Sequence, residues 1–127
     1  MNKKLKNSEE KMTLALMVRH MSRTEQKQLD HDKCVESKAI EWKNDGYIVF
    51  ADLEGWNKPV EVEGYIPDII ARKKGVARIC EVETEDTLED HRPKWESFKK
   101  FAEGIKGTSF WLFLAKEGGK CKYIEPS

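Results

Sequence analysis

The spacing of apolar positions predicts two helices on either side of a group of strands. Between residues 33 and 44, Val35, Ala39 and Trp42 recur at steps of four and three, which is typical of one buried helix face. Asp32 is a candidate cap for the start of this helix, and the residues NDG that follow it indicate its end. A second helix is predicted over residues 93–103 by the same kind of spacing.

Runs rich in β-branched and aromatic residues predict the strands. They cover residues 47–53, 65–72, 76–84 and 109–115, with a last edge strand at 121–125. The residues KKG between the second and third runs indicate a tight turn, so these two strands should pair as a hairpin.

The order helix, three strands, helix, strand predicts one α/β domain with a mixed central sheet flanked by helices. The chain has 127 residues, which suits a single domain of common size. Residues 1–30 are polar apart from one short apolar island, and we interpret them as an N-terminal helical arm or extension to a domain over residues 31–127. Met12, Leu16 and Met17 on this arm are candidates for contact with a second copy, as in a homodimer.

Composition limits the compartment and the partners. Lysine plus arginine equals aspartate plus glutamate, 23 each, so any surface that binds nucleic acid must be local. The three cysteines are odd in number and widely spaced, which argues against a disulfide framework or a zinc site and favours a reducing, cytoplasmic location. No apolar run approaches the roughly 18 residues of a membrane span, so no membrane partner is expected.

Three carboxylates interrupt the apolar strands. Asp68 follows Pro67 in the second strand, and Glu81 and Glu83 lie two residues apart in the third. Since side chains alternate along a strand, Glu81 and Glu83 should share one face, and the hairpin should bring Asp68 beside Glu81, although the sequence leaves the register open. Charged groups in an apolar setting are costly unless a partner balances them.

A divalent cation is one such partner. Close carboxylates repel each other, and oxygen ligands on a rigid sheet suit Mg²⁺ or Mn²⁺. A cation held there lowers the pKa of a bound water and neutralises charge on a phosphate, which is the chemistry of a phosphodiesterase. The alternative is a solvated strand face, on which the two glutamates pair across the hairpin with Arg72, Lys74 or Arg78.

The pattern Pro67-Asp68 followed by Glu81-Val82-Glu83 resembles the PD-(D/E)xK nuclease superfamily. The likeness covers roughly residues 33–116 and is nearest to the Holliday-junction-resolvase-like and restriction-endonuclease-like branches. It implies a restriction-endonuclease-like fold, DNA as substrate and Mg²⁺ or Mn²⁺ as cofactor. It also implies that Asp68, Glu81 and the carbonyl of Val82 bind the metal.

The resemblance further implies a glutamate on the first helix as an auxiliary metal ligand, for which Glu36 matches best and Glu41 is the weaker candidate. The chain departs from the motif at one position, because Glu83 stands where the family has lysine. Glu83 is therefore a candidate metal ligand or water-orienting base. Alternatively, the lysine has moved to the following helix, where Lys94 is the first candidate and Lys99 the second.

These residues predict a Mg²⁺-dependent DNA endonuclease, a hydrolase acting on phosphodiester bonds. The alternatives are a non-catalytic DNA-binding or assembly module that retains the fold, and a nuclease subunit targeted by a partner. The acidic run after the third strand opposes DNA binding in that region. His31 and His91 are interpreted as incidental, at a helix entry and in a surface loop, and Trp56 as a candidate partner contact.

Overall fold

The computed structural model of the protein describes the backbone of residues 8–126 and the side chains of residues 25–126. Its elements are α1 (Ser8–Asn44), β1 (Ile48–Ala51), β2 (Ile69–Lys73), β3 (Val76–Glu83), α2 (Arg92–Glu103), β4 (Thr108–Ala115), the short 3-10 turn η1 (Glu117–Gly119) and β5 (Cys121–Ile124). The strands form one five-stranded sheet in the order β1-β2-β3-β4-β5, with β3 and β4 parallel and the other neighbours antiparallel. The prediction of an α/β protein with a mixed sheet is confirmed.

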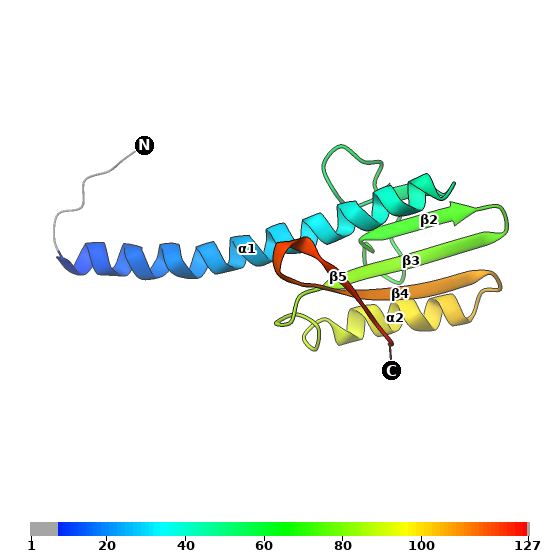
Figure 1. Ribbon diagram of the computed structural model, residues 1–127. Coiled ribbons are helices and arrows are strands. Elements are labelled where there is room, and N and C mark those ends of the chain that lie inside the picture. The colour runs from blue at the N-terminus through cyan, green and yellow to red at the C-terminus, as the bar shows by residue number, and fades with distance from the viewer. Residues whose placement is uncertain (1–7, 127) are drawn as a thin grey trace.

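Two helices cover the two faces of the sheet (Figure 1). On the α1 side, Val35, Ala39 and Trp42 pack with Cys80 and Val82 of β3 in one apolar cluster. On the other side, Phe98 and Ala102 of α2 pack with Ile70 and Ile79 in a second cluster. Because alternate residues of β3 enter opposite clusters, each face of the sheet has its own core.

The β2–β3 hairpin closes at the predicted tight turn. Lys73 pairs with Val76, and Gly75, the second residue of the turn, has a positive φ of 74°, which glycine adopts readily. β2 begins at Ile69, later than the sequence suggests, because Pro67 has no N–H to donate to a sheet. Ile69 pairs with Cys80, which settles the register and places Asp68 one step further, beside Glu81.

α2 connects the parallel strands β3 and β4, as a crossover helix does. Its buried residues are Trp95, Phe98 and Ala102, and the indole N–H of Trp95 donates to the carbonyl of Leu88 at 2.9 Å. This anchoring fixes the start of α2, which carries Lys94, against the carboxyl end of β3.

α1 is one continuous helix across the expected boundary at residue 30. The prediction that a helix starts near residue 33 with Asp32 as its cap is wrong. Asp32 lies within α1, where its side chain accepts hydrogen bonds from Gln28 and His31. Asp30, on the other side of the expected boundary, is buried. The proposed dimer contacts Met12, Leu16 and Met17 lie outside the described side chains.

Cys34 of α1 and Cys121 at the start of β5 form a disulfide, with their Cα atoms 5.3 Å apart. The expectation of no disulfide is therefore wrong, and the cytoplasmic location that rested on it loses that support. The two cysteines are 87 residues apart, so no short spacing motif marks them, and an odd count of three leaves room for one bridge. Cys80 is buried and free.

Within residues 8–126, no helix combines the length and the apolar character that a membrane span requires.

Candidate functional site

A cavity of about 180 Å³ lies where the carboxyl end of β3 meets the segment before β2 and the start of α2. The carboxylates of Asp68, Glu81 and Glu83 all line it. His31 lines it from α1, and His91 and Lys94 line it from the start of α2. The polar residues of the sequence motif therefore share one cavity with four basic side chains, those of Lys27, His31, His91 and Lys94.

Asp68 and Glu81 hold each other in place through backbone contacts. The N–H of Asp68 donates to Glu81 Oε1 at 3.2 Å, and the N–H of Val82 donates to Asp68 Oδ2 at 2.8 Å. The Glu81 side chain is 1% exposed and that of Asp68 13% exposed. The prediction that the hairpin brings the two carboxylates together is confirmed; their catalytic role stays a prediction.

Lys94 supplies a cation to this pair. Its ammonium nitrogen lies 2.6 Å from Glu81 Oε2, and its side chain is 26% exposed. The position follows from the crossover, because the helix after β3 starts beside the carboxyl end of that strand. The structure thus places a lysine of the following helix beside the motif glutamate.

His31 belongs to the site, although the sequence gives it only an incidental place at a helix entry. Its Nε2 lies 3.3 Å from Asp68 Oδ2 and its Nδ1 lies 2.9 Å from Asp32 Oδ1. His31 precedes Val35 by four residues, so it extends the buried face of α1 toward the cavity. This four-residue spacing is overlooked when the helix is assumed to begin at residue 33.

Glu83 occupies the same cavity with a different partner. It shares a strand face with Glu81, as predicted, and is 2% exposed. Its Oε1 accepts a hydrogen bond from Thr87 Oγ1 at 2.9 Å and lies 2.7 Å from Nδ1 of His91. Its Oε2 is buried without a hydrogen-bond partner among the described residues. The interpretation of His91 as an incidental loop residue is therefore wrong, because it contacts Glu83.

The structure does not bring Glu36 to the carboxylates. Glu36 is exposed and lines a separate hollow with Ile40 and Leu53. It follows His31 by five residues, which turns it about 140° around the helix axis. Glu41 is also exposed and pairs with Lys38 at 2.9 Å. The prediction of Glu36 or Glu41 as the helix ligand is thus wrong for this arrangement, and the α1 side chain that contacts Asp68 is that of His31.

The alternative of a solvated strand face is wrong, since both glutamates are buried. The arginine of β3, Arg78, is engaged elsewhere: its guanidinium lies 4.5 Å from the ring centre of Tyr47, 4.8 Å from Trp111 and 5.0 Å from Trp42. These are cation–π contacts. Arg78 thus belongs to the opposite face of the sheet.

Burial and mutual repulsion set the charge state of the pair. Burial, followed by the charge of Asp68, raises the pKa of Glu81 well above its ordinary value, and Lys94 only partly opposes this. Burial would also raise the pKa of Asp68, but the hydrogen bond and charge of His31 lower it overall. Asp68 therefore loses its proton at a lower pH than an ordinary aspartate, and Glu81 keeps its proton to a higher pH than an ordinary glutamate.

We expect His31 to titrate far above an ordinary histidine in the metal-free protein. Burial lowers its pKa, but the hydrogen bonds and charges of Asp68 and Asp32 outweigh this and raise it to about 9. A raised folded-state pKa stabilises the protein fully below the ordinary value of 6.5, and that stabilisation is lost as the pH rises toward about 9. NMR titration of the imidazole in EDTA measures this, and Asp68→Asn should lower the value. A His31 pKa near 6.5 in both proteins would contradict the contact.

The cavity suits a hard cation in its chemistry. Asp68 and Glu81 offer carboxylate oxygens, and extra positive charge would favour the ionised form that burial opposes in Glu81. The unsatisfied Glu83 Oε2 is a further oxygen at the same cavity. As the side chains lie, no ready-made set of three histidine, cysteine or acidic ligands forms in the part of the chain that the structure describes. Cation binding would therefore rearrange the contacts of Lys94 or His31.

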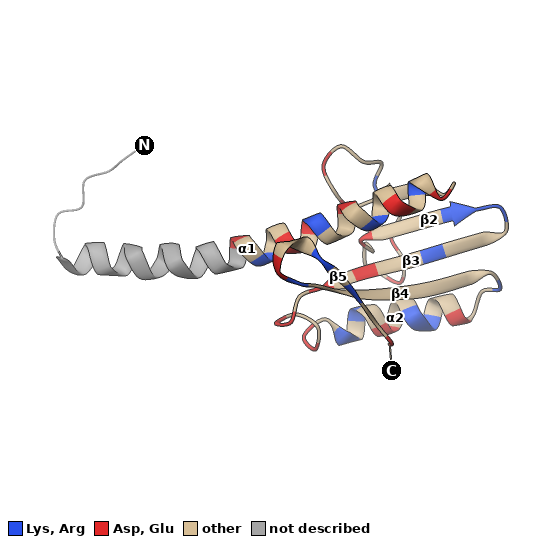
Figure 2. Ribbon diagram, viewed as in Figure 1, with Lys and Arg blue, Asp and Glu red and all other residues tan. Residues whose placement is uncertain are grey.

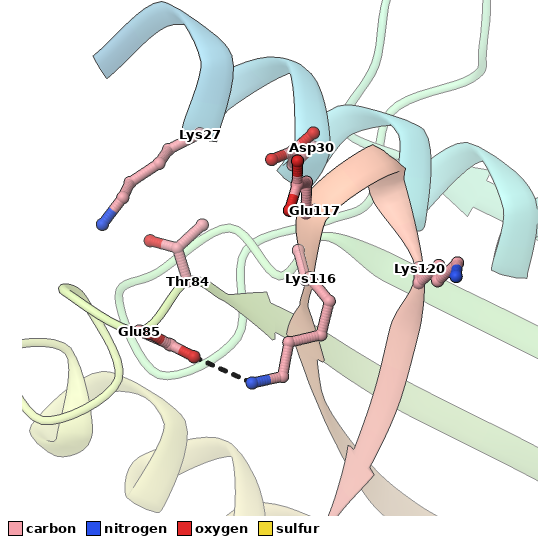
Figure 3. A pocket seen from close by; sticks show the side chains of 8 residues that line it. Lys27, Asp30, Thr84, Glu85, Lys116, Glu117 and Lys120 are labelled. Carbon is pink, nitrogen blue, oxygen red and sulfur yellow. Dashed lines mark hydrogen bonds and ion pairs between the residues drawn. The ribbon is translucent and has the colours of Figure 1, made fainter. Parts of the chain in front are cut away.

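A second hollow, of about 610 Å³, adjoins the cavity at Lys27 and Thr84 (Figure 3). Its charged residues are Lys27, Lys116 and Lys120 with Asp30, Glu85 and Glu117. Lys116 pairs with Glu85 at 2.8 Å, and Lys27 pairs with Asp86 at 3.4 Å. Because its charges balance, this hollow has no marked preference for an anion.

Comparison of the chain with protein-family models and with curated proteins finds no match. The fold and the site define an α/β protein with a buried carboxylate pair at one end of a mixed sheet.

Proposed function

We propose that this protein is a divalent-cation-dependent DNA endonuclease with a restriction-endonuclease-like fold, of the PD-(D/E)xK kind. The observation that carries the proposal is the buried pair of Asp68 and Glu81 at the end of the β2–β3 hairpin, with Lys94 of the crossover helix 2.6 Å from Glu81. Buried carboxylates and a lysine at one cavity are typical of a catalytic site, because such burial is otherwise unfavourable.

Asp68 and Glu81 would hold Mg²⁺ or Mn²⁺, together with the main-chain carbonyl of Val82. Such a cation, when bound, supplies a water of lowered pKa and positive charge beside the scissile phosphate. Asp68 is suited to this task because contacts with His31 and the N–H of Val82 keep it ionised. The same contacts fix the direction of its carboxylate.

Lys94 would stabilise the negative charge that develops on the phosphate. The carboxylates around it outweigh the effect of burial and raise its pKa, so the ammonium stays charged. Its anchored helix start pre-organises the charge, which is the condition under which electrostatic stabilisation is effective. Lys94 would thus take the role of the lysine whose motif position Glu83 occupies.

Glu83→Gln is expected to slow cleavage by about a hundred- to ten-thousand-fold, the range for loss of an acid–base group. Glutamine keeps the shape and can still accept from Thr87, so folding and DNA binding should persist. Glu83→Lys separates two roles: it should raise activity if the position merely lacks the family's residue, and lower it if the carboxylate binds metal or orients water. Wild-type rates in Glu83→Gln would remove Glu83 from the mechanism.

The direct test is cleavage by the purified full-length chain of linear, branched and single-stranded DNA, each with Mg²⁺, Mn²⁺ or EDTA. We expect cleavage of at least one DNA with a divalent cation and none in EDTA. Failure to cut any of them, while Mg²⁺ and Mn²⁺ leave the thermal unfolding temperature unchanged, would overturn the proposal.

One observation favours the second candidate, a DNA-binding module or partner-dependent subunit that does not cut alone. His31 and Lys94 already supply positive charge to Asp68 and Glu81, so the site has internal partners without a metal. DNA binding that persists unchanged in EDTA, without cleavage under any metal condition, would select this alternative.

A further inference from the structure

Positive charge gathers at the end of the sheet opposite the carboxylates (Figure 2). We call this surface the basic end and define it by Arg72, Lys73 and Lys74 at the β2–β3 turn and Lys106 before β4. These residues are exposed and line one hollow of about 400 Å³. None of the described residues that line it is acidic, unlike the hollow at the other end.

The two chain segments that form the basic end are held together. The N–H of Ala77 donates to the carbonyl of Gly107 at 2.9 Å. A Cβ on Gly107 would lie only 2.5 Å from the carbonyl oxygen of Gly75, so the close approach of the two loops requires glycine. Four cations from two segments are therefore presented on one fixed surface rather than on independent loops.

Lys73 differs from the other three. Its ammonium donates to the carbonyl of Asp45 at 2.7 Å and lies 5.2 Å from the ring centre of Tyr47. Lys73 is thus hydrogen-bonded within the fold. The guanidinium of Arg72 also lies over a ring, 5.9 Å from the centre of Phe50, but Arg72 is exposed. The cations best placed to meet an external anion are therefore those of Arg72, Lys74 and Lys106.

β3 sets the separation between the basic end and the carboxylates. From Val76, the strand reaches Glu81 after five steps and Glu83 after seven steps of about 3.3 Å, or about 17 Å and about 23 Å. Successive base pairs of a duplex rise by about 3.4 Å, so these lengths correspond to about five to seven base pairs. A duplex that passes the two ends of the sheet would contact both places at this spacing.

We propose that the basic end binds the phosphate backbone of duplex DNA about five to seven base pairs from the carboxylate cavity, through Arg72, Lys74 and Lys106. This inference rests on the proposed function for its choice of partner. It also answers the objection raised by the acidic run after β3: the DNA is held at a distance from the carboxylates, and only the scissile phosphate needs to approach them.

The test compares two triple variants for binding to a mixed-sequence duplex of about 30 base pairs in EDTA, where no cleavage occurs. The first carries Arg72→Gln, Lys74→Gln and Lys106→Gln. The matched control carries Lys100→Gln, Lys120→Gln and Lys122→Gln, three exposed lysines elsewhere. We expect the first to bind at least about ten-fold more weakly, with a salt dependence shallower by about 2–3 in slope, since each phosphate contact contributes about 0.9. The control should match wild type.

Equal affinity and slope in wild type and the first variant would overturn the inference, as would an equal loss in the control. Tighter binding of duplex RNA, or of vesicles containing phosphatidylserine, through the same three residues would also overturn the assignment to DNA. Circular dichroism and thermal unfolding check that both variants fold.

Cleavage of the small diester bis(4-nitrophenyl) phosphate separates this inference from the proposed function. If the wild type hydrolyses it with Mn²⁺ and the first variant does so equally, the basic end acts in binding alone. If the wild type cuts nothing but the first variant still loses duplex binding, the inference stands and the proposed catalysis fails. A first variant that binds duplex normally but hydrolyses the diester more slowly would overturn the inference and leave the catalysis in place.

Discussion

Asp68→Asn is expected to reduce DNA cleavage by about a hundred- to ten-thousand-fold, the range associated with loss of one catalytic group. Asparagine has nearly the same shape and can still accept from the N–H of Val82, which lies 2.8 Å from Asp68 Oδ2. It cannot carry the negative charge that a divalent cation requires. Binding of duplex DNA in EDTA should persist or strengthen, because a negative charge leaves the cavity.

The matched control is Asp52→Asn. Asp52 is exposed, and its N–H donates to the carbonyl of Asp68 at 2.9 Å, so it lies near the site without lining the cavity. Cleavage rates and metal titrations for the two variants and the wild type give the comparison. If both variants cut at the wild-type rate, Asp68 is not a metal ligand and the proposed function loses its main support.

Lys94→Met should slow cleavage by about a hundred- to a thousand-fold, as the loss of one electrostatic stabiliser does. It should also destabilise the metal-free protein by about 1–3 kcal/mol near neutral pH, because it leaves the Glu81 carboxyl buried without its partner. Protonation of Glu81 limits this loss, since burial already raises the pKa of that group. The destabilisation should therefore shrink as the pH falls.

Chemical denaturation at several pH values and cleavage assays test the two parts separately. Lys100→Met is the control, an exposed lysine on the same helix. Lys94→Arg keeps the charge and should recover most of the stability and part of the rate. A Lys94→Met protein that is less stable but cuts normally would limit Lys94 to a structural role.

The sequence predicts the parts of the fold that local chemistry determines. The KKG turn and the alternation in residues 76–83 lead directly to the hairpin and to the shared face of Glu81 and Glu83. The helix over residues 93–103 follows from its apolar spacing, and with it the position of Lys94 at the end of the parallel strand. In each case, the pattern that predicts the element lies within a few neighbouring residues.

Features that depend on tertiary contacts were missed. His31 reaches Asp68 only because α1 continues without a break across residue 30. The polar sequence around residue 30 does not predict this continuation. Distance along the chain favours Glu36 as the helix ligand, whereas the angle around the helix axis decides which side chain meets the sheet. The partner of Glu83, His91, lies in a loop whose course follows from packing, not from local pattern.

The disulfide between Cys34 and Cys121 makes most of the domain a covalent ring, with β1 to β4 and α2 between its two ends. A single proteolytic cut in the segment between β1 and β2 would therefore yield two pieces that remain joined. Loop closure over 87 residues also restricts the unfolded chain, which in the chain-entropy model is worth about 4–5 kcal/mol. His31 lies one turn of helix before the linked cysteine, so the same bond keeps the α1 residue of the site tethered to the far edge of the sheet even when the chain is nicked.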